Sequence, residues 1–178
     1  KHLLKYLLAA AVLPLWGQAA AAGPFGQLRG LCEPGKSVLL TAPTVVEGIV
    51  VSDFHSKNME ANPSVSYDKV DVTVNDCTAY LESPDGRYGF RLRFDTPEDN
   101  VLARGTRLSL SLSGTVLTRE ENPERYTISS LVGENMVESV AGEAIPVKQR
   151  RISELTDDDV YTFVSLENTE FLFLSLIH

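Results

Sequence analysis

The residues best suited to chemistry lie on one predicted strand in the middle of the chain. Alternation places Arg87, Arg91 and Arg93 on one side of this strand. Its other side carries Tyr88, Phe90, Leu92 and Phe94. Arginine donates charge-assisted hydrogen bonds to anions, and a tyrosine at a strand end, Tyr80 or Tyr88, offers a plane for stacking. The pattern predicts a ligand-binding surface of Arg87, Tyr88, Arg91 and Arg93, and the alternative is an ordinary solvated strand face.

No residue pattern in the sequence indicates catalysis. The sequence has no G-x-S-x-G elbow, P-loop, H-E-x-x-H pair or Gly-rich dinucleotide turn. The acidic pairs Glu98-Asp99 and Glu120-Glu121 fall in predicted turns, where carboxylates are usually solvated. Asp157 to Asp159 lack the spacing of a calcium loop and are expected to cap one helical turn, with Thr156. We therefore expect a non-enzyme with no catalytic residues, metal or cofactor.

Length and charge narrow the class of protein. The chain has 178 residues, of which 43% are hydrophobic, enough for one packed domain and a smaller addition. Its formal net charge of -8 lowers the expectation of nucleic-acid binding, although local basic patches are compatible with it.

The first residues are typical of a secretory signal. Lys1 and Lys5 precede an apolar stretch, Leu7 to Trp16, and small residues Ala20 to Ala22 follow it. The alternative is a membrane anchor, but the apolar run is shorter than the ~20 residues that a spanning helix needs. We therefore predict a signal peptide over residues 1–22 and an exported protein in the periplasm, at the cell surface or outside the cell.

Export bears on the only two cysteines, Cys32 and Cys77. An oxidising compartment would let them pair, so a Cys32–Cys77 disulfide is one expectation. Two separate thiols are the other, because nothing in the sequence brings these residues together.

Strand patterns organise the rest of the chain. Leucines at 108, 110 and 112 alternate with serines, which predicts a strand with one buried face, and Gly114 then predicts a bend. A β-branched strand is expected over Val45–Ser52. A hairpin is expected around Ser83–Gly86, and a last strand at Arg125–Ser129. Five or six strands over about 90 residues predict an all-β, five-stranded OB-like Greek-key barrel, with an immunoglobulin-like sandwich as the alternative.

The same patterns suggest the domain boundaries. Residues 23–36 are predicted to be a linker, 37–142 the barrel, and 143–178 a junction and the truncated start of a second, similar β unit. Within the barrel, Asp53–Tyr67 is expected to be a long polar loop. The alternating Val70–Val74 that follows is compatible with a strand.

Several stretches also resemble an uncharacterised family of OB-fold-like domains from exported and surface proteins of Bacteroides-type bacteria. The resemblance rests on Glu47–Asp53, the Tyr80–Gly86 turn, Tyr88–Asp95 and Leu110–Thr115, with Ile152–Thr156 resembling a repeat junction. It implies a cell-envelope address and supplies no catalytic residues.

These observations lead to two expected functions. The first is a non-catalytic binding or scaffold module of the cell envelope that engages a glycan, a protein or an oligonucleotide. The second is an accessory OB-like domain of a secreted hydrolase or nuclease whose catalytic part lies beyond residue 178.

Overall fold

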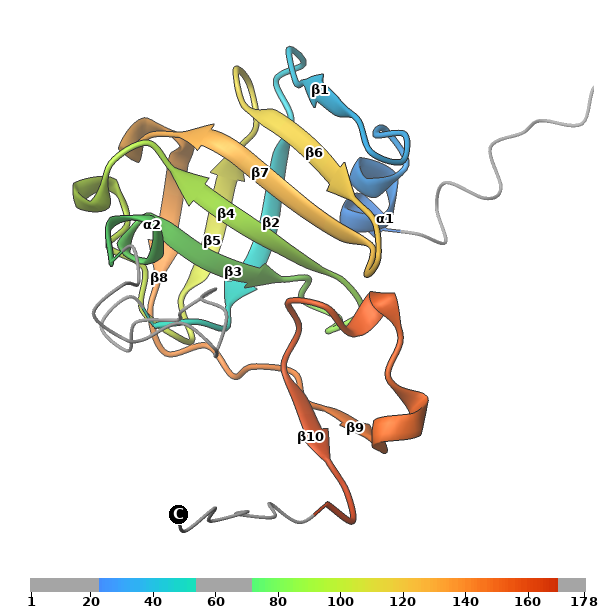
Figure 1. Ribbon diagram of the computed structural model, residues 1–178. Coiled ribbons are helices and arrows are strands. Elements are labelled where there is room, and N and C mark those ends of the chain that lie inside the picture. Colours follow the sequence, from blue (N-terminus) through green and yellow to red (C-terminus); the bar gives the residue numbers. More distant parts are fainter. Residues whose placement is uncertain (1–22, 54–71, 170–178) are drawn as a thin grey trace, which may run out of the picture.

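The computed structural model describes residues 23–53 and 72–169, and a mixed β-sheet dominates it (Figure 1). The sheet has eight strands, namely β1 (Ser37–Leu39), β2 (Val45–Val50), β3 (Thr78–Glu82), β4 (Gly89–Phe94), β5 (Arg107–Ser111), β6 (Val116–Glu120), β7 (Arg125–Leu131) and β8 (Met136–Val140). Their spatial order is β1-β6-β7-β4-β3-β2-β5-β8. Only the β4–β7 pair is parallel within this sheet. The prediction of a mostly β chain is confirmed, but within the described residues the ladder ends at β1 and β8 and no closed barrel is found.

The serine-leucine stretch forms the strand that its alternation predicts. Leu108, Leu110 and Leu112 are fully buried in the core. The chain then bends at Gly114, whose φ of 85° lies in the left-handed region that favours glycine. The bend divides the stretch into β5, which pairs with β2 and β8, and β6, which pairs with β1 and β7.

Gly48 allows β2 to lie close to its neighbour. A Cβ atom at Gly48 would lie 2.6 Å from Leu81 Cγ and 2.8 Å from the Glu82 carbonyl oxygen. β2 pairs with β5 over Val45–Ile49 but meets β3 only at Ile49 and Val50. One strand thus serves two neighbours, and the glycine allows the close approach that this requires.

The segment predicted to be a linker begins with a helix that completes the core. In α1 (Gly23–Arg29), Phe25 and Leu28 are three positions apart and both are buried. The Phe25 ring meets Phe90 edge-on, with 5.1 Å between ring centroids. The linker prediction is therefore wrong for this part of residues 23–36, because the two apolar side chains anchor α1 against the sheet.

The chain before β3 is also helical. The predicted strand at Val70–Val74 is wrong in the part that the structure describes, because Val72–Asp76 forms the short helix α2. The hydroxyl of Thr78 donates to the Val74 carbonyl at 2.7 Å and ties α2 to the start of β3. The predicted polar loop at Asp53–Tyr67 lies outside the described residues except for its first residue. No described helix is long and apolar enough to span a membrane.

Residues 143–169 follow β8 and form a segment that we call the strap, which lies below the sheet near the end of the β3–β4 hairpin in Figure 1. It contains β9 (Lys148–Arg150) and β10 (Val164–Leu166), which pair in parallel, and the 3-10 turns Ile152–Glu154 and Asp157–Asp159. The second turn has the predicted cap, because Asp159 Oδ2 accepts a hydrogen bond from the Thr156 amide at 2.9 Å. Among the described residues of 143–178, the strands are the short β9 and β10, and the start of a second, similar β unit over this range stays a prediction.

Candidate binding surface on the outer face of β3 and β4

The β3–β4 hairpin positions the candidate site. Its register places Tyr80 opposite Arg91 and Thr78 opposite Arg93, all on the face turned away from the core. On the inner side Leu81, Phe90 and Leu92 are fully buried. We call the surface that carries Thr78, Tyr80, Glu82, Gly89, Arg91 and Arg93 the outer face.

The two arginines of the outer face are tethered by neighbouring elements. Arg91 Nε donates to Thr127 Oγ1 at 2.9 Å on β7, and its Nη2 lies 3.0 Å from Glu120 Oε2 on β6. Arg93 Nη1 donates to the carbonyl of Val74 in α2 at 2.9 Å. Their guanidinium groups are thus oriented along the sheet rather than extended into solvent.

The other two predicted residues lie elsewhere. Arg87 is exposed in the turn before β4. Tyr88 belongs to the opposite side, where the guanidinium of Arg29 lies 4.7 Å from its ring centroid. Arg29 is itself buried and pairs with Glu124 at 3.0 Å and Asp158 at 2.7 Å. The structure therefore brings Arg91 and Arg93 together with Tyr80, and separates them from Tyr88.

The strap covers part of the outer face, which the sequence does not predict. The Tyr161 ring stacks on Tyr80 with 4.8 Å between centroids and 10° between planes. The Arg91 guanidinium lies 6.0 Å from the Tyr161 centroid. The strap backbone approaches because Gly89 has no side chain, since a Cβ there would lie 2.4 Å from the Tyr161 carbonyl oxygen. In the sequence, the one sign of this contact is Gly89, a glycine between large residues of a strand. A glycine there could have indicated that another segment of the chain lies on the outer face.

Glu82 lies beneath the strap and has an unusual environment. Its side chain is 0% exposed, and its Oε2 accepts a hydrogen bond from the Phe163 amide at 2.9 Å. Its Oε1 is buried and has no hydrogen-bond partner among residues 23–53 and 72–169. Burial raises the pKa of Glu82 to about 7, against the opposing effects of the Phe163 amide and of Lys148. A carboxyl group in this position favours its protonated form.

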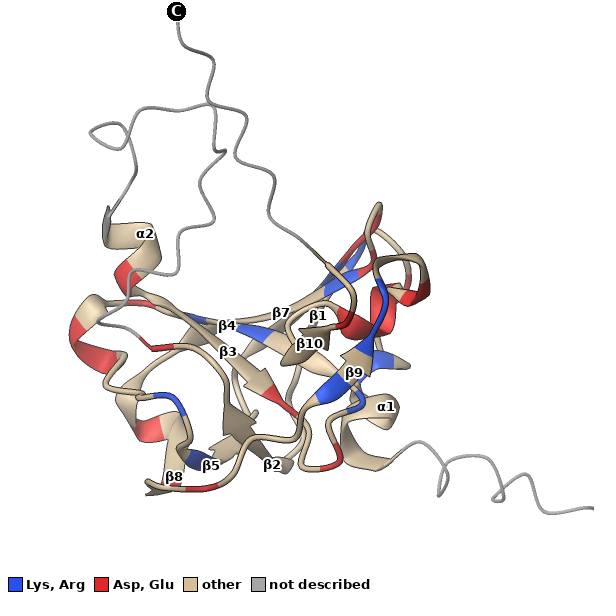
Figure 2. Cartoon of the chain, turned by 90° about the horizontal axis from the view of Figure 1, so that it is seen from below, with Lys and Arg blue, Asp and Glu red and all other residues tan. Residues whose placement is uncertain are grey.

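Ion pairs and hydrogen bonds hold the strap in shape and against the hairpin. Lys148 Nζ lies 2.7 Å from Asp159 Oδ1 and donates to the Arg87 carbonyl at 3.4 Å. Arg150 reaches the same Asp159 oxygen at 3.4 Å. In Figure 2 the basic residues of β9 lie beside the acidic turn of the strap. Just before β10, the ring of Phe163 contacts Arg104, whose guanidinium lies 4.4 Å from the ring centroid.

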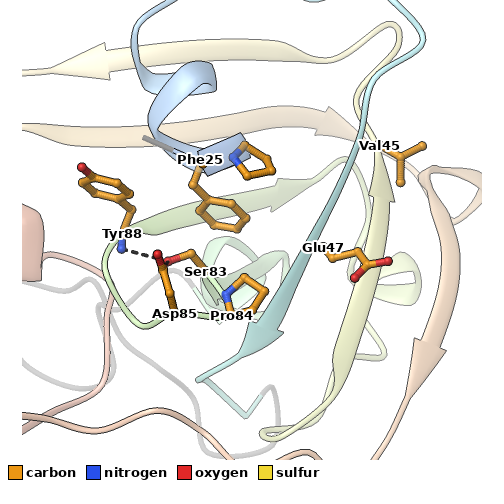
Figure 3. Close-up of a pocket in the computed structure, with 9 residues that line it drawn as sticks. Phe25, Val45, Glu47, Ser83, Pro84, Asp85 and Tyr88 are labelled. Atoms are coloured by element: carbon orange, nitrogen blue, oxygen red, sulfur yellow. Dashed lines mark hydrogen bonds between the residues drawn. The ribbon is translucent and has the colours of Figure 1, made fainter. Parts of the chain in front are cut away.

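A pocket of about 550 Å³ opens on the other side of the hairpin, between α1, β2 and the β3–β4 turn (Figure 3). Phe25 and Tyr88 line it together with Glu47 and Asp85. Asp85 Oδ1 accepts hydrogen bonds from Ser83 Oγ at 2.6 Å and from the Arg87 amide at 3.1 Å. Burial opposes the charge on Asp85, but these bonds prevail and lower its pKa. Tyr88 thus lines this pocket and does not belong to the outer face that carries Arg91 and Arg93.

The cysteines do not form the predicted disulfide. Cys32 and Cys77 are both buried thiols. Cys32 Sγ donates to the Lys36 carbonyl at 3.1 Å, beside β1. Cys77 lies at the start of β3, where its carbonyl accepts from the Phe94 amide at 2.9 Å. The disulfide expectation is wrong because both residues are thiols, Cys32 in the bend after α1 and Cys77 in the turn that precedes β3. Within the described part of the chain, no three His, Cys, Asp or Glu residues are grouped to hold a metal ion.

Comparisons with family models, curated proteins and solved structures found no match to this chain.

Proposed function

We propose that this chain is a non-catalytic protein-interaction module of an exported cell-envelope protein, and that its outer face binds a peptide segment with an aromatic side chain. The observation that carries this proposal is the stack of Tyr161 on Tyr80 beside Arg91. The strap occupies the outer face as a bound peptide would. Export is supported by the charged and apolar pattern of residues 1–22.

The contacts of the strap define what such a peptide needs. An aromatic ring stacks on Tyr80, its backbone carbonyl lies over Gly89, and the amide two residues later donates to Glu82. A hydrogen bond from a peptide amide together with an aromatic contact gives both affinity and register. The matching pattern is aromatic-x-aromatic, which the strap supplies as Tyr161-Thr162-Phe163.

An OB-type arrangement of the strands supports the same surface. In this comparison β2 is the first strand, β3 the second and β4 the third. β5 and β6 are the two halves of one bent fourth strand, and β7 is the fifth. The face of these two strands is where OB domains bind their ligands. The strand that serves two neighbours and the parallel β4–β7 pair are further support for this fold assignment.

Competition with the strap tests the proposal. A fluorescein-labelled peptide of residues 156–169 is titrated into the full chain and into its Tyr161→Ala variant. We expect the variant to bind about 2- to 10-fold tighter, because loss of the stacked ring, worth about 0.5–1.5 kcal/mol, opens the outer face. Adding Tyr80→Ala to Tyr161→Ala should abolish that gain.

Two controls make the result specific. The first control adds Val137→Ala, at an exposed position on β8, to Tyr161→Ala in place of Tyr80→Ala. This double variant should bind the peptide as tightly as Tyr161→Ala alone. The peptide that carries Tyr161→Ala itself should bind weakly to every variant. Equal affinity of the peptide for the wild-type and Tyr161→Ala chains, with no effect of Tyr80→Ala, would overturn the proposal.

A further inference from the structure

We propose that the strap is a latch on the peptide-binding outer face and that Glu82 makes its closure depend on pH, so that the latch is tight in acid and loosens toward alkaline pH. This inference rests on the proposed function, because it describes the regulation of the same face.

The geometry makes Glu82 the group at which the strap and the sheet meet. Its Oε2 holds the Phe163 amide, and its Oε1 is enclosed without a partner among the described residues. A Cβ at Gly86 would lie 3.0 Å from this Oε1 and 2.9 Å from Pro146 Cβ, so the hairpin turn and the strap close tightly around the carboxyl group. A negative charge enclosed in this way costs free energy that is recovered when the strap leaves.

The charged groups around Glu82 only partly offset this cost. Lys148 of β9 attracts the ionised carboxylate, and Asp85 of the β3–β4 turn repels it. Lys148 is already paired with Asp159 at 2.7 Å. The net result is the raised pKa of Glu82, about 7 in the closed state, with burial as the largest cause.

The direction of the pH dependence follows from this shift. With the strap open, the carboxyl group is solvated and its pKa returns toward the ordinary value of 4.5. Closing the latch therefore takes up a proton at any pH between these two values. Closure is tightest below about pH 4.5, weakens up to about pH 7, and then stays weak. A shift of this size changes the closure equilibrium by about 300-fold in total, and by about 70-fold between pH 5 and pH 8.

Amide hydrogen exchange at Phe163 in the full chain measures closure directly. The rate at each pH is divided by the rate in the free peptide of residues 156–169, which removes the intrinsic pH dependence of exchange. We expect protection in the wild-type chain to fall by at least tenfold between pH 5 and pH 8. Glu82→Gln keeps an acceptor for the Phe163 amide but cannot ionise, so its protection should be independent of pH. Asp85→Asn is the matched control and should keep the fall.

An equal fall in the wild-type and Glu82→Gln chains would overturn the latch. That result would leave the proposed function standing, because the affinity gain of Tyr161→Ala does not depend on pH coupling. A second measurement needs no variant, namely the NMR titration of the Glu82 side-chain carboxyl carbon. A midpoint near 7 supports the latch, and a midpoint near 4.5 overturns it.

Discussion

Replacement of Gly89 by alanine should detach the strap while leaving the sheet intact. A Cβ atom at this position would lie 2.4 Å from the carbonyl oxygen of Tyr161 and 2.7 Å from that of Val160. Both atoms belong to the backbone, so no side-chain rotation relieves the overlap. Ordinary contact begins at 3.4 Å, so the strap must move outward by about 1 Å.

The size of the effect follows from the two contacts that such a movement breaks. The stack of Tyr161 on Tyr80 is worth about 0.5–1.5 kcal/mol beyond its buried area. The hydrogen bond from the Phe163 amide to Glu82 is worth about 1–3 kcal/mol, depending on the charge of the carboxyl group. Their loss together amounts to about 1.5–4.5 kcal/mol, or a fall of about 10- to 2000-fold in local protection.

Hydrogen exchange and urea unfolding separate the local effect from a global one. Exchange at Phe163 should accelerate in Gly89→Ala, whereas exchange of sheet amides should accelerate no more than the fall in the free energy of unfolding requires, and that fall should not exceed the loss of the two strap contacts. The reason is that no described residue of the strap belongs to the hydrophobic core cluster. Gly30→Ala is the matched control, because its Cβ would meet only ordinary contacts, the nearest at 3.4 Å. Unchanged protection at Phe163 in Gly89→Ala would refute the close docking of the strap.

Two further predictions concern the other side of the hairpin and the thiols. Arg29→Ala should lower the free energy of unfolding in urea by about 1–2 kcal/mol, because it removes a buried guanidinium that pairs with Glu124 and Asp158 and lies over the Tyr88 and Tyr126 rings. A loss below about 0.5 kcal/mol would contradict this role. Reducing agent should leave the melting temperature unchanged, because Cys32 and Cys77 are separate thiols. Both should react with a maleimide once the chain is unfolded without reductant, and a single or absent modification would contradict that state.

The strand faces could be predicted from the sequence because alternation is a local property. A period of two places Phe90 and Leu92 on the opposite side of β4 from Arg91, whatever the rest of the fold is. The same reasoning gave the buried leucines of β5 and the bend at Gly114. These predictions needed no knowledge of which strands are neighbours in the sheet.

Helix α1 shows where local reasoning fails. Its seven residues include Gly23, Pro24 and Gly26, which are poor helix formers, so intrinsic propensity predicts a linker. The helix is stable because Phe25 and Leu28 enter the core, and such burial is set by distant strands. Tertiary packing therefore outweighs propensity at this end of the chain.

The strap could not be predicted for a related reason. Tyr161 and Tyr80 are far apart in the sequence, and a single aromatic contact between them leaves no periodic signal. The alternation of β4 correctly turned Arg91 and Arg93 away from the core. It could not reveal that another segment of the chain lies on that face.

The partners of the arginines also change the expected ligand. Arg91 already contacts Glu120 and Thr127, and Arg93 contacts the end of α2, so part of their capacity to bind anions is used within the protein. The net charge of -8 further opposes a polyanionic ligand. What the outer face still offers is an aromatic plane, a backbone accessible at a glycine and a carboxyl acceptor. A peptide backbone with an aromatic side chain complements all three, which supports the proposal that the ligand is a polypeptide.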